Sequence, residues 1–183
     1  MKRRDFLTGT SLATLSAGVQ FAPAASEGGN TTFSALTFSP SQWTTIEVVQ
    51  EHLLPSEPDA PGASDCSATA YLDRSLSDPK FDPDVKGFVL NGIGWLEEIA
   101  ERQEGQPFGQ IQPAKREDLL RQIARSSAGE RWLSTLITYS LEALLADPLY
   151  GGNPGGIGWK WLGHDPGQPR PTPNKIYGRL GKA

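Results

Sequence analysis

The sequence predicts a small all-α protein, a bundle of about five helices followed by an irregular C-terminal tail rich in Gly, Pro and Trp. In five stretches between residues 31 and 146, apolar residues recur every three or four positions, the spacing of one buried helix face. Helix-capping residues precede several of these stretches, and none of them alternates as a half-buried strand would. Residues 147–183 hold nine Gly and six Pro in 37 positions, without a helical repeat.

The first two predicted helices are separated by a loop at residues 56–64 that is rich in proline and glycine. Ser39-Pro40-Ser41-Gln42 is a capping box with proline at the first helical position, and Pro55 ends the helix that follows. The second helix is expected at residues 64–76. The expected inner faces are Trp43, Ile46, Val49 and Leu53, and then Ala68, Tyr71, Leu72 and Leu76.

Three further helices are expected at residues 83–103, 113–126 and 127–146. Asp82 caps the third helix, whose Gly87 and Gly94 would be tolerated where another backbone packs close. A capping box from Ser127 to Glu130 begins the fifth, which is the most apolar and therefore expected at the centre. The expected inner faces are Val85, Phe88, Val89, Gly92, Leu96 and Ile99; Leu119, Leu120 and Ile123; and Trp132, Leu133, Leu136, Ile137, Leu141, Leu144 and Leu145.

Residues 1–24 have the pattern of an export signal. A basic start is followed by a weakly apolar run at residues 7–21 and by an A-x-A cleavage site that ends at Ala24. The paired arginines resemble the twin-arginine export motif, so we expect a periplasmic protein. Ordinary secretion, an amphipathic helix and a membrane anchor are the alternatives, although the run is short and polar for an anchor. The motif residues are Arg3, Arg4, Phe6 and Leu7.

The composition excludes several kinds of site. One Cys cannot form a disulfide framework or a cysteine-based metal site within the chain, and two His leave little material for a metal centre. A net charge of −4 and a pI near 5.2 argue against nucleic acid as a partner. Without residues 1–24, the body to residue 146 has 9 basic and 18 acidic residues, whereas the tail has five and two. We expect no cofactor in this chain.

Candidates for catalysis are few. The glycines from Gly152 to Gly158 follow no strand and lack the Gly-Lys-Ser/Thr ending of a phosphate-binding loop. His52 and the pair His164-Asp165 belong to no recognisable nucleophile or metal motif. We therefore predict no catalytic residue. The alternatives are a self-contained periplasmic enzyme built on these His and Asp side chains, or a binding module unrelated to redox chemistry.

The aromatic residues of the tail and the single cysteine are the candidates for contact with another protein. Large aromatic side chains gain by burial, either against the bundle or in an interface. Cys66 is either a small buried residue or one half of a disulfide to a partner subunit. The predicted interface residues are Tyr150, Gly151, Gly152, Asn153, Trp159 and Trp161.

Several segments together resemble one protein family. They are Leu53-Leu54-Pro55, Asp59-Ala60-Pro61-Gly62-Ala63, Tyr71-Leu72-Asp73, Asp147-Pro148-Leu149-Tyr150-Gly151-Gly152-Asn153 and Gly158-Trp159-Lys160-Trp161-Leu162-Gly163. The set is similar to the gluconate 2-dehydrogenase subunit 3 family, the small subunit of membrane-associated flavin dehydrogenases, over about residues 36–167. The tail beyond Gly167 has no counterpart in this pattern.

The resemblance implies a division of labour between subunits. The small subunit is non-catalytic, its signal exports the large subunit, and its body supports maturation and stability. The large subunit contains FAD and is of the glucose–methanol–choline type, and in many such assemblies a cytochrome c subunit with haem c completes the complex. The resemblance therefore implies membrane association through partners and a sugar or sugar acid as the substrate of the complex.

Overall fold

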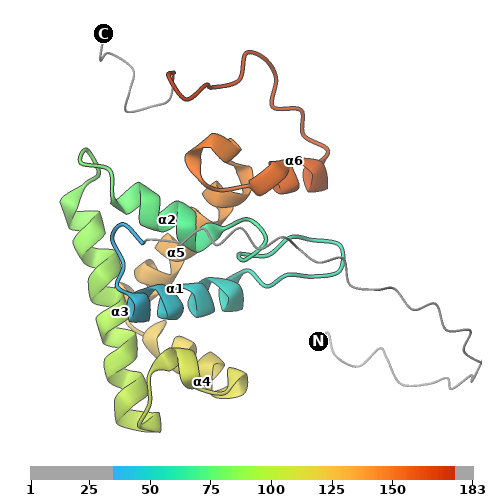
Figure 1. Cartoon of the computed structure of the whole chain (residues 1–183). Helices are drawn as coiled ribbons and strands as arrows, with labels where there is room; N and C mark the ends of the chain where they lie inside the picture. The colour runs from blue at the N-terminus through green and yellow to red at the C-terminus, as the bar shows by residue number, and fades with distance from the viewer. Residues whose placement is uncertain (1–34, 176–183) are drawn as a thin grey trace, which may run out of the picture. The chain divides into compact units, whose positions relative to one another are not determined.

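A computed structural model of the chain describes residues 35–175 (Figure 1). Six α-helices and three short 3-10 turns account for this region, which contains an isolated bridge between Glu57 and Ala60 but no strand. The all-α prediction is confirmed. The export signal at residues 1–24 lies outside the described residues. The α-helices are α1 (Pro40–Leu53), α2 (Ala68–Leu76), α3 (Pro83–Glu104), α4 (Pro113–Ile123), α5 (Ser127–Leu145) and α6 (Ile157–Leu162).

The helix boundaries follow local capping chemistry. The capping box at Ser39 is present, and Asp82 caps α3 by accepting from the Asp84 N–H. The predicted cap of α5 is wrong by one residue, because the Ser126 hydroxyl accepts from the Gly129 N–H at 3.0 Å. Ser126 must be extended to act as a cap, so α4 ends at Ile123, earlier than expected.

The second helix is also shorter than predicted. It begins at Ala68, because residues 63–67 form hydrogen-bonded turns. Ser67 has a φ of 57°, in the left-handed region, which a continuous right-handed helix cannot include. The start of α2 is therefore determined by the loop before it, whose conformation the apolar spacing does not report.

The central position of α5 is confirmed by its contacts with α1, α2, α3 and α6. The Trp132 indole is fully buried and donates to the Val89 carbonyl of α3 at 3.1 Å. A Cβ atom on Gly92 would lie 2.2 Å from this indole, so the close approach requires glycine there. Gly87 and Gly94, where close packing was expected, have no neighbour near the Cβ direction.

The helices α1, α2 and α5 are connected by a buried polar cluster. The Gln50 amide donates to the Ser140 hydroxyl at 3.1 Å and accepts from the Thr69 hydroxyl at 2.8 Å. Ser140 in turn donates to the Leu136 carbonyl at 2.9 Å. Because each buried polar group has a partner, the cluster fixes how these three helices face one another without leaving an unpaired group.

The segment that leads into α1 is held by one carboxylate. Asp73 on α2 is buried and accepts from the backbone N–H groups of Leu36, Thr37 and Phe38 at 2.7, 2.9 and 2.8 Å. Hydrogen bonds to an ionised acceptor are stronger than neutral ones. Asp73 therefore fixes the first described residues against α2.

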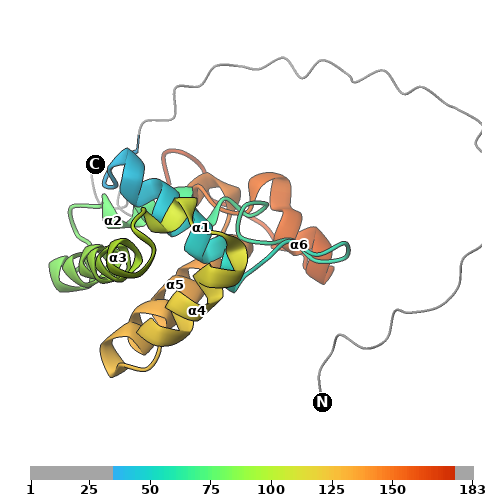
Figure 2. The ribbon, with the colours of Figure 1, turned by 90° about the horizontal axis from the view of Figure 1, so that it is seen from below.

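Figures 1 and 2 show the arrangement from two directions. In both views, α3 and α6 lie on opposite sides of the bundle. The helix α6 contacts the bundle through α5. The C-terminal half of α5 and its surroundings are therefore where the tail and the helical body meet.

Candidate docking surface

The tail is held to the body by Asn153, which is fully buried and has a φ of 50°. Its amide nitrogen donates to the Ala146 carbonyl at 2.9 Å, and its amide oxygen accepts from the Gly158 N–H at 2.8 Å. Its backbone N–H donates to the Cys66 carbonyl at 3.0 Å. One side chain thus joins the end of α5 to the start of α6.

The glycines of the tail allow backbone to pack directly on α5. A Cβ atom on Gly152 would lie 2.5 Å from the Ala143 carbonyl oxygen, and one on Gly158 would lie 2.0 Å from that of Leu144. Neither position can therefore hold a side chain without movement of the backbone. This packing explains why these two positions are glycine.

The tail contains a short helix that the sequence did not predict. Six residues, Ile157–Leu162, form α6, although the expectation was a tail without helical structure. Such a helix is too short to be stable alone. It forms here because Asn153 accepts from its first turn and because Gly156 and Gly163, with φ of 70° and 63°, flank it in the left-handed region.

Trp159 is buried within the chain, which corrects its predicted place in a partner interface. Only 8% of this residue is exposed, and its indole N–H donates to the Leu145 carbonyl at 2.8 Å. The Arg170 guanidinium lies 4.8 Å from its ring centre and also donates to Asp147 through Nε and Nη2 at 3.0 and 2.9 Å. Trp159 therefore attaches the tail to the last carbonyls of α5, which no helical N–H can reach.

The other predicted interface residues differ in how far they are buried. Gly152 and Asn153 are buried in the contacts described above, so their side of the tail faces the bundle. Tyr150 and Gly151 are half-buried. Trp161, on the opposite side of α6 from Trp159, is 47% exposed and remains a candidate for contact with a partner.

A stripe of apolar side chains along α5 is exposed, although all of them were predicted to face the core. Ile137, Leu141 and Leu145 are 40%, 45% and 49% exposed. They recur at spacings of four residues and so lie on one side of the helix. The neighbouring face, with Leu136, Ala143 and Leu144, is the one that packs inside. We call Ile137, Leu141 and Leu145 the α5 stripe.

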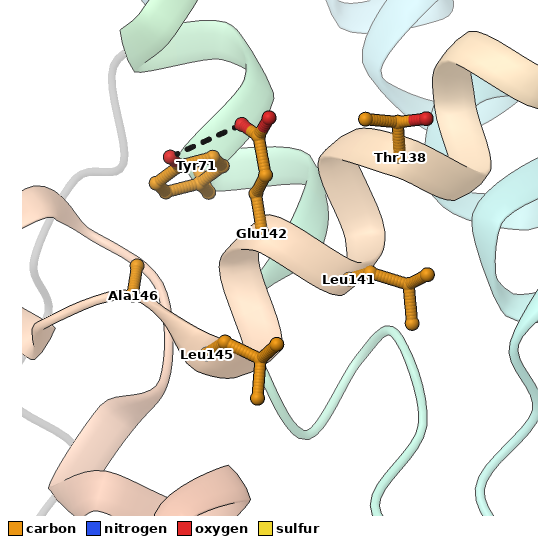
Figure 3. Close-up of a pocket in the computed structure, with 6 residues that line it drawn as sticks. All are labelled: Tyr71, Thr138, Leu141, Glu142, Leu145 and Ala146. Carbon is orange, nitrogen blue, oxygen red and sulfur yellow. Dashed lines mark hydrogen bonds between the residues drawn. The ribbon is translucent and has the colours of Figure 1, made fainter.

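An open groove of about 470 Å³ runs beside two residues of the α5 stripe (Figure 3). Two of the lining residues are joined, because the Tyr71 hydroxyl donates to the Glu142 carboxylate at 3.4 Å. Burial and the charge of Glu142 raise the pKa of Tyr71 to about 12, so the phenol remains a donor at neutral pH. The lining residues are Tyr71, Thr138, Leu141, Glu142, Leu145 and Ala146.

Cys66 is a free thiol with no exposed surface. Its sulfur lies 3.4 Å from the Ala63 carbonyl oxygen and 3.8 Å from that of Ser140. Burial raises the pKa of the thiol to about 11. A disulfide to another chain requires an accessible sulfur, so this geometry favours the alternative of a small buried residue.

The two histidines are not brought together. The His52 ring forms a hydrogen bond with Glu117 between α1 and α4, and this hydrogen bond lowers the pKa of the Glu117 carboxyl group. His164 is exposed beside the Trp159 ring. Asp165 accepts from the Gly167 N–H in a local turn. In the part of the chain that the structure describes, no three His, Cys, Asp or Glu side chains are grouped as metal ligands.

None of the helices between residues 35 and 175 combines the length and apolar character that a membrane crossing requires. The α5 stripe covers one side of a helix whose other side is packed into the bundle. It is therefore a surface feature of a folded domain and a candidate contact surface.

Comparison with known proteins identifies the family to which the chain belongs. The family profile Gluconate 2-dehydrogenase subunit 3 matches residues 40–167, most of the chain. The chain belongs to this family, which confirms the resemblance of the sequence segments. Its members are subunits, so partner subunits of a dehydrogenase complex are implied. No curated protein and no solved structure matches the chain.

The sequence did not predict the role of Arg170 in the packing of the tail or the exposure of the α5 stripe. Arg170 lies beyond the part of the tail that could be interpreted, yet it covers Trp159. The exposure of Leu141 and Leu145 was missed because the fifth helix is apolar around much of its circumference. One signal was available: the seven apolar positions on one helix form a face wider than the single stripe that usually packs against a core.

Proposed function

We propose that this chain is the non-catalytic small subunit of a periplasmic, membrane-associated FAD-dependent dehydrogenase that oxidises a sugar or sugar acid. Family membership supports the place in a dehydrogenase complex. The observation that supports a role as partner of another subunit is the exposed α5 stripe, in a chain whose buried Asp73 and Asn153 side chains hold its own fold. What this surface offers is a site for a partner protein.

In this proposal the chain acts on the flavin subunit in two ways. Its twin-arginine leader exports a large subunit that folds and takes up FAD in the cytoplasm, so the two subunits cross the membrane together. Its folded body then covers apolar surface of the partner and stabilises it. FAD is held by the large subunit, and haem c by a cytochrome subunit where the complex has one. Attachment to the membrane comes through these partners.

Deletion of residues 1–24 tests the export role. We expect dehydrogenase activity and the flavin subunit to remain in the cytoplasm when the leader is absent, and to return to the periplasm when it is restored. A variant with Lys in place of both arginines, Arg3→Lys with Arg4→Lys, keeps the charge and should abolish export through this pathway. Periplasmic activity without the leader would contradict the proposal.

Isolation of the native complex tests the partner assignment. The complex captured through this chain should show the absorption bands of flavin, with haem bands if a cytochrome is present. The purified chain alone should oxidise no sugar or sugar acid with an artificial electron acceptor. Turnover by the isolated chain would instead support the self-contained enzyme.

A further inference from the structure

The side-chain hydroxyl donors that line the groove beside the α5 stripe are already hydrogen-bonded within the chain, whereas its acceptors can still bind a ligand. The Thr138 hydroxyl donates to the Ser134 carbonyl at 2.9 Å, and the Tyr71 hydroxyl donates to Glu142. Both oxygens can still accept, and the Glu142 carboxylate can only accept. Among the described residues, none of the Lys and Arg ion pairs includes Glu142. The groove therefore combines an apolar side with an acceptor-only rim.

We propose that this groove binds an apolar segment of the flavin subunit that carries a Lys or Arg placed against Glu142. The inference rests on the proposed function and adds to it the site of contact and the chemistry of the partner. Apolar side chains of the segment cover Leu141 and Leu145, while the cation supplies the donors that the rim lacks. Arg suits this role best, because its planar group donates several hydrogen bonds at once and is enriched in interfaces.

Charge argues against a second copy of this chain as the occupant. In a two-fold contact the same patch meets itself, so the two Glu142 carboxylates would approach one another and two acceptor-only rims would face each other. Like charges in an interface cost binding free energy. A membrane surface is disfavoured for a related reason, since its anionic headgroups attract basic segments and repel a carboxylate.

Photo-cross-linking identifies the occupant directly. The experiment uses the complex co-expressed with its flavin subunit, with Leu141→p-benzoylphenylalanine as the probe and the same replacement at Leu36 as the control. Leu36 is an exposed apolar residue outside the groove lining. We expect a cross-link from position 141 to an apolar segment of the flavin subunit that contains Lys or Arg. A cross-link to a second copy, to lipid or to this chain's own leader would overturn the inference.

Binding measurements test the two parts of the groove separately. Leu141→Asp should weaken binding to the flavin subunit about 30-fold or more, as the loss of a central interface residue does. Glu142→Gln, which keeps the shape and removes the charge, should weaken it about 5-fold and reduce its dependence on salt. Glu101→Lys, on the exposed surface of α3, is the charge control and should bind normally.

The outcomes separate this inference from the proposed function. If the wild-type chain holds a flavoprotein but both groove variants bind it as tightly as wild type, the inference is wrong and the proposed function stands. If the wild-type chain holds no flavoprotein, both fail. Circular dichroism of each purified variant shows that reduced binding is not caused by unfolding, because the replaced side chains are exposed.

Discussion

Trp159 in the tail and Leu141 on α5 show the reverse of the burial that their sequence context predicts. The tryptophan lies in a segment rich in Gly and Pro and was predicted to face a partner, yet it is buried in the chain's own fold. The leucine lies in the most apolar helix and was predicted to be in the core, yet it is exposed. Both residues are apolar, so hydrophobicity alone does not separate a buried position from an exposed one.

The polar environment explains the difference. The end of α5 leaves carbonyl groups without helical partners, and the Trp159 indole and the Asn153 amide donate to two of them. A side chain that is both apolar and a donor is therefore drawn to this place. Leu141 has nothing to donate, and the space beside it is left open by the neighbouring helices. Unpaired carbonyl groups at a helix end can therefore decide which aromatic residue is buried, because they favour a side chain that donates a hydrogen bond.

Replacement of Trp159 should have the largest effect on the isolated chain. Trp159→Ala removes a buried ring and leaves the Leu145 carbonyl unpaired, so we expect the free energy of unfolding to fall by about 3–5 kcal/mol. Trp161→Ala, which changes the exposed tryptophan of the same helix, should cost less than about 1 kcal/mol. Denaturation in urea measures both. Equal losses of stability in the two variants would mean that the buried and the exposed side of α6 contribute equally to the fold, contrary to this prediction.

Asn153→Ala should have the next largest effect. It removes the side chain that pairs with Ala146 and Gly158, and we expect a loss of about 2–3 kcal/mol because buried polar groups are left unpaired. Asn91→Ala, at an exposed position of α3, should leave the stability nearly unchanged. Thermal unfolding of the two variants compares them, and a small effect at position 153 would mean that the tail is not fixed by this residue.

The buried thiol of Cys66 makes the free energy of unfolding of the chain depend on pH. Its pKa is raised from 9.0 to about 11 in the folded chain, so the folded state keeps the proton when the unfolded state has lost it. This contribution is fully present below pH 9 and is lost as the pH rises through 11, an effect of about 2 kcal/mol.

The measurement is the free energy of unfolding between pH 8 and 11, for wild type and for Cys66→Ala. The difference between the two should shrink as the pH rises. Labelling with a thiol reagent at neutral pH should also be slow in the folded chain and fast in denaturant. Rapid labelling of the folded chain would restore the alternative of an accessible, partner-bridging cysteine.

The smallest expected effect concerns Leu141. In the isolated chain, Leu141→Ala should change the free energy of unfolding by less than about 1 kcal/mol, because 45% of this residue is already exposed. Leu144→Ala, on the buried face of the same helix, should cost about 2–5 kcal/mol. Matched urea titrations give both values. A large loss at Leu141 would place it in the core after all.

The positions of the five main helices could be predicted from the sequence because capping and apolar spacing are local signals. Ser39 and Asp82 begin α1 and α3 as expected, and Ile46, Val49 and Leu96 are buried as expected. The early end of α4 and the late start of α2 could not be predicted. Each depends on a neighbouring loop whose backbone geometry has no simple sequence pattern.

The candidate site could be predicted only in part. That the tail contributes to recognition was inferred from its aromatic residues, and Trp161 is still consistent with that role. The hydrogen bonds of the Asn153 N–H to Cys66 and of Asp73 to Leu36 join residues that are distant in sequence, so only the tertiary structure reveals them. The α5 stripe was hidden for a further reason: a face that binds a partner and a face that fills the core have the same apolar spacing.

Hydroxyl-radical footprinting of the chain, alone and in complex with the proposed flavin subunit, shows whether the α5 stripe is the surface that a partner covers. Oxidation of Leu141 and Leu145 should be readily detected in the isolated chain and should fall sharply in the complex. Oxidation of Trp159 should be low in both states, because its ring is covered by the chain itself. Unchanged oxidation of the α5 stripe in the complex, with protection appearing at Trp159 instead, would show that the tail and not the α5 stripe contacts the partner.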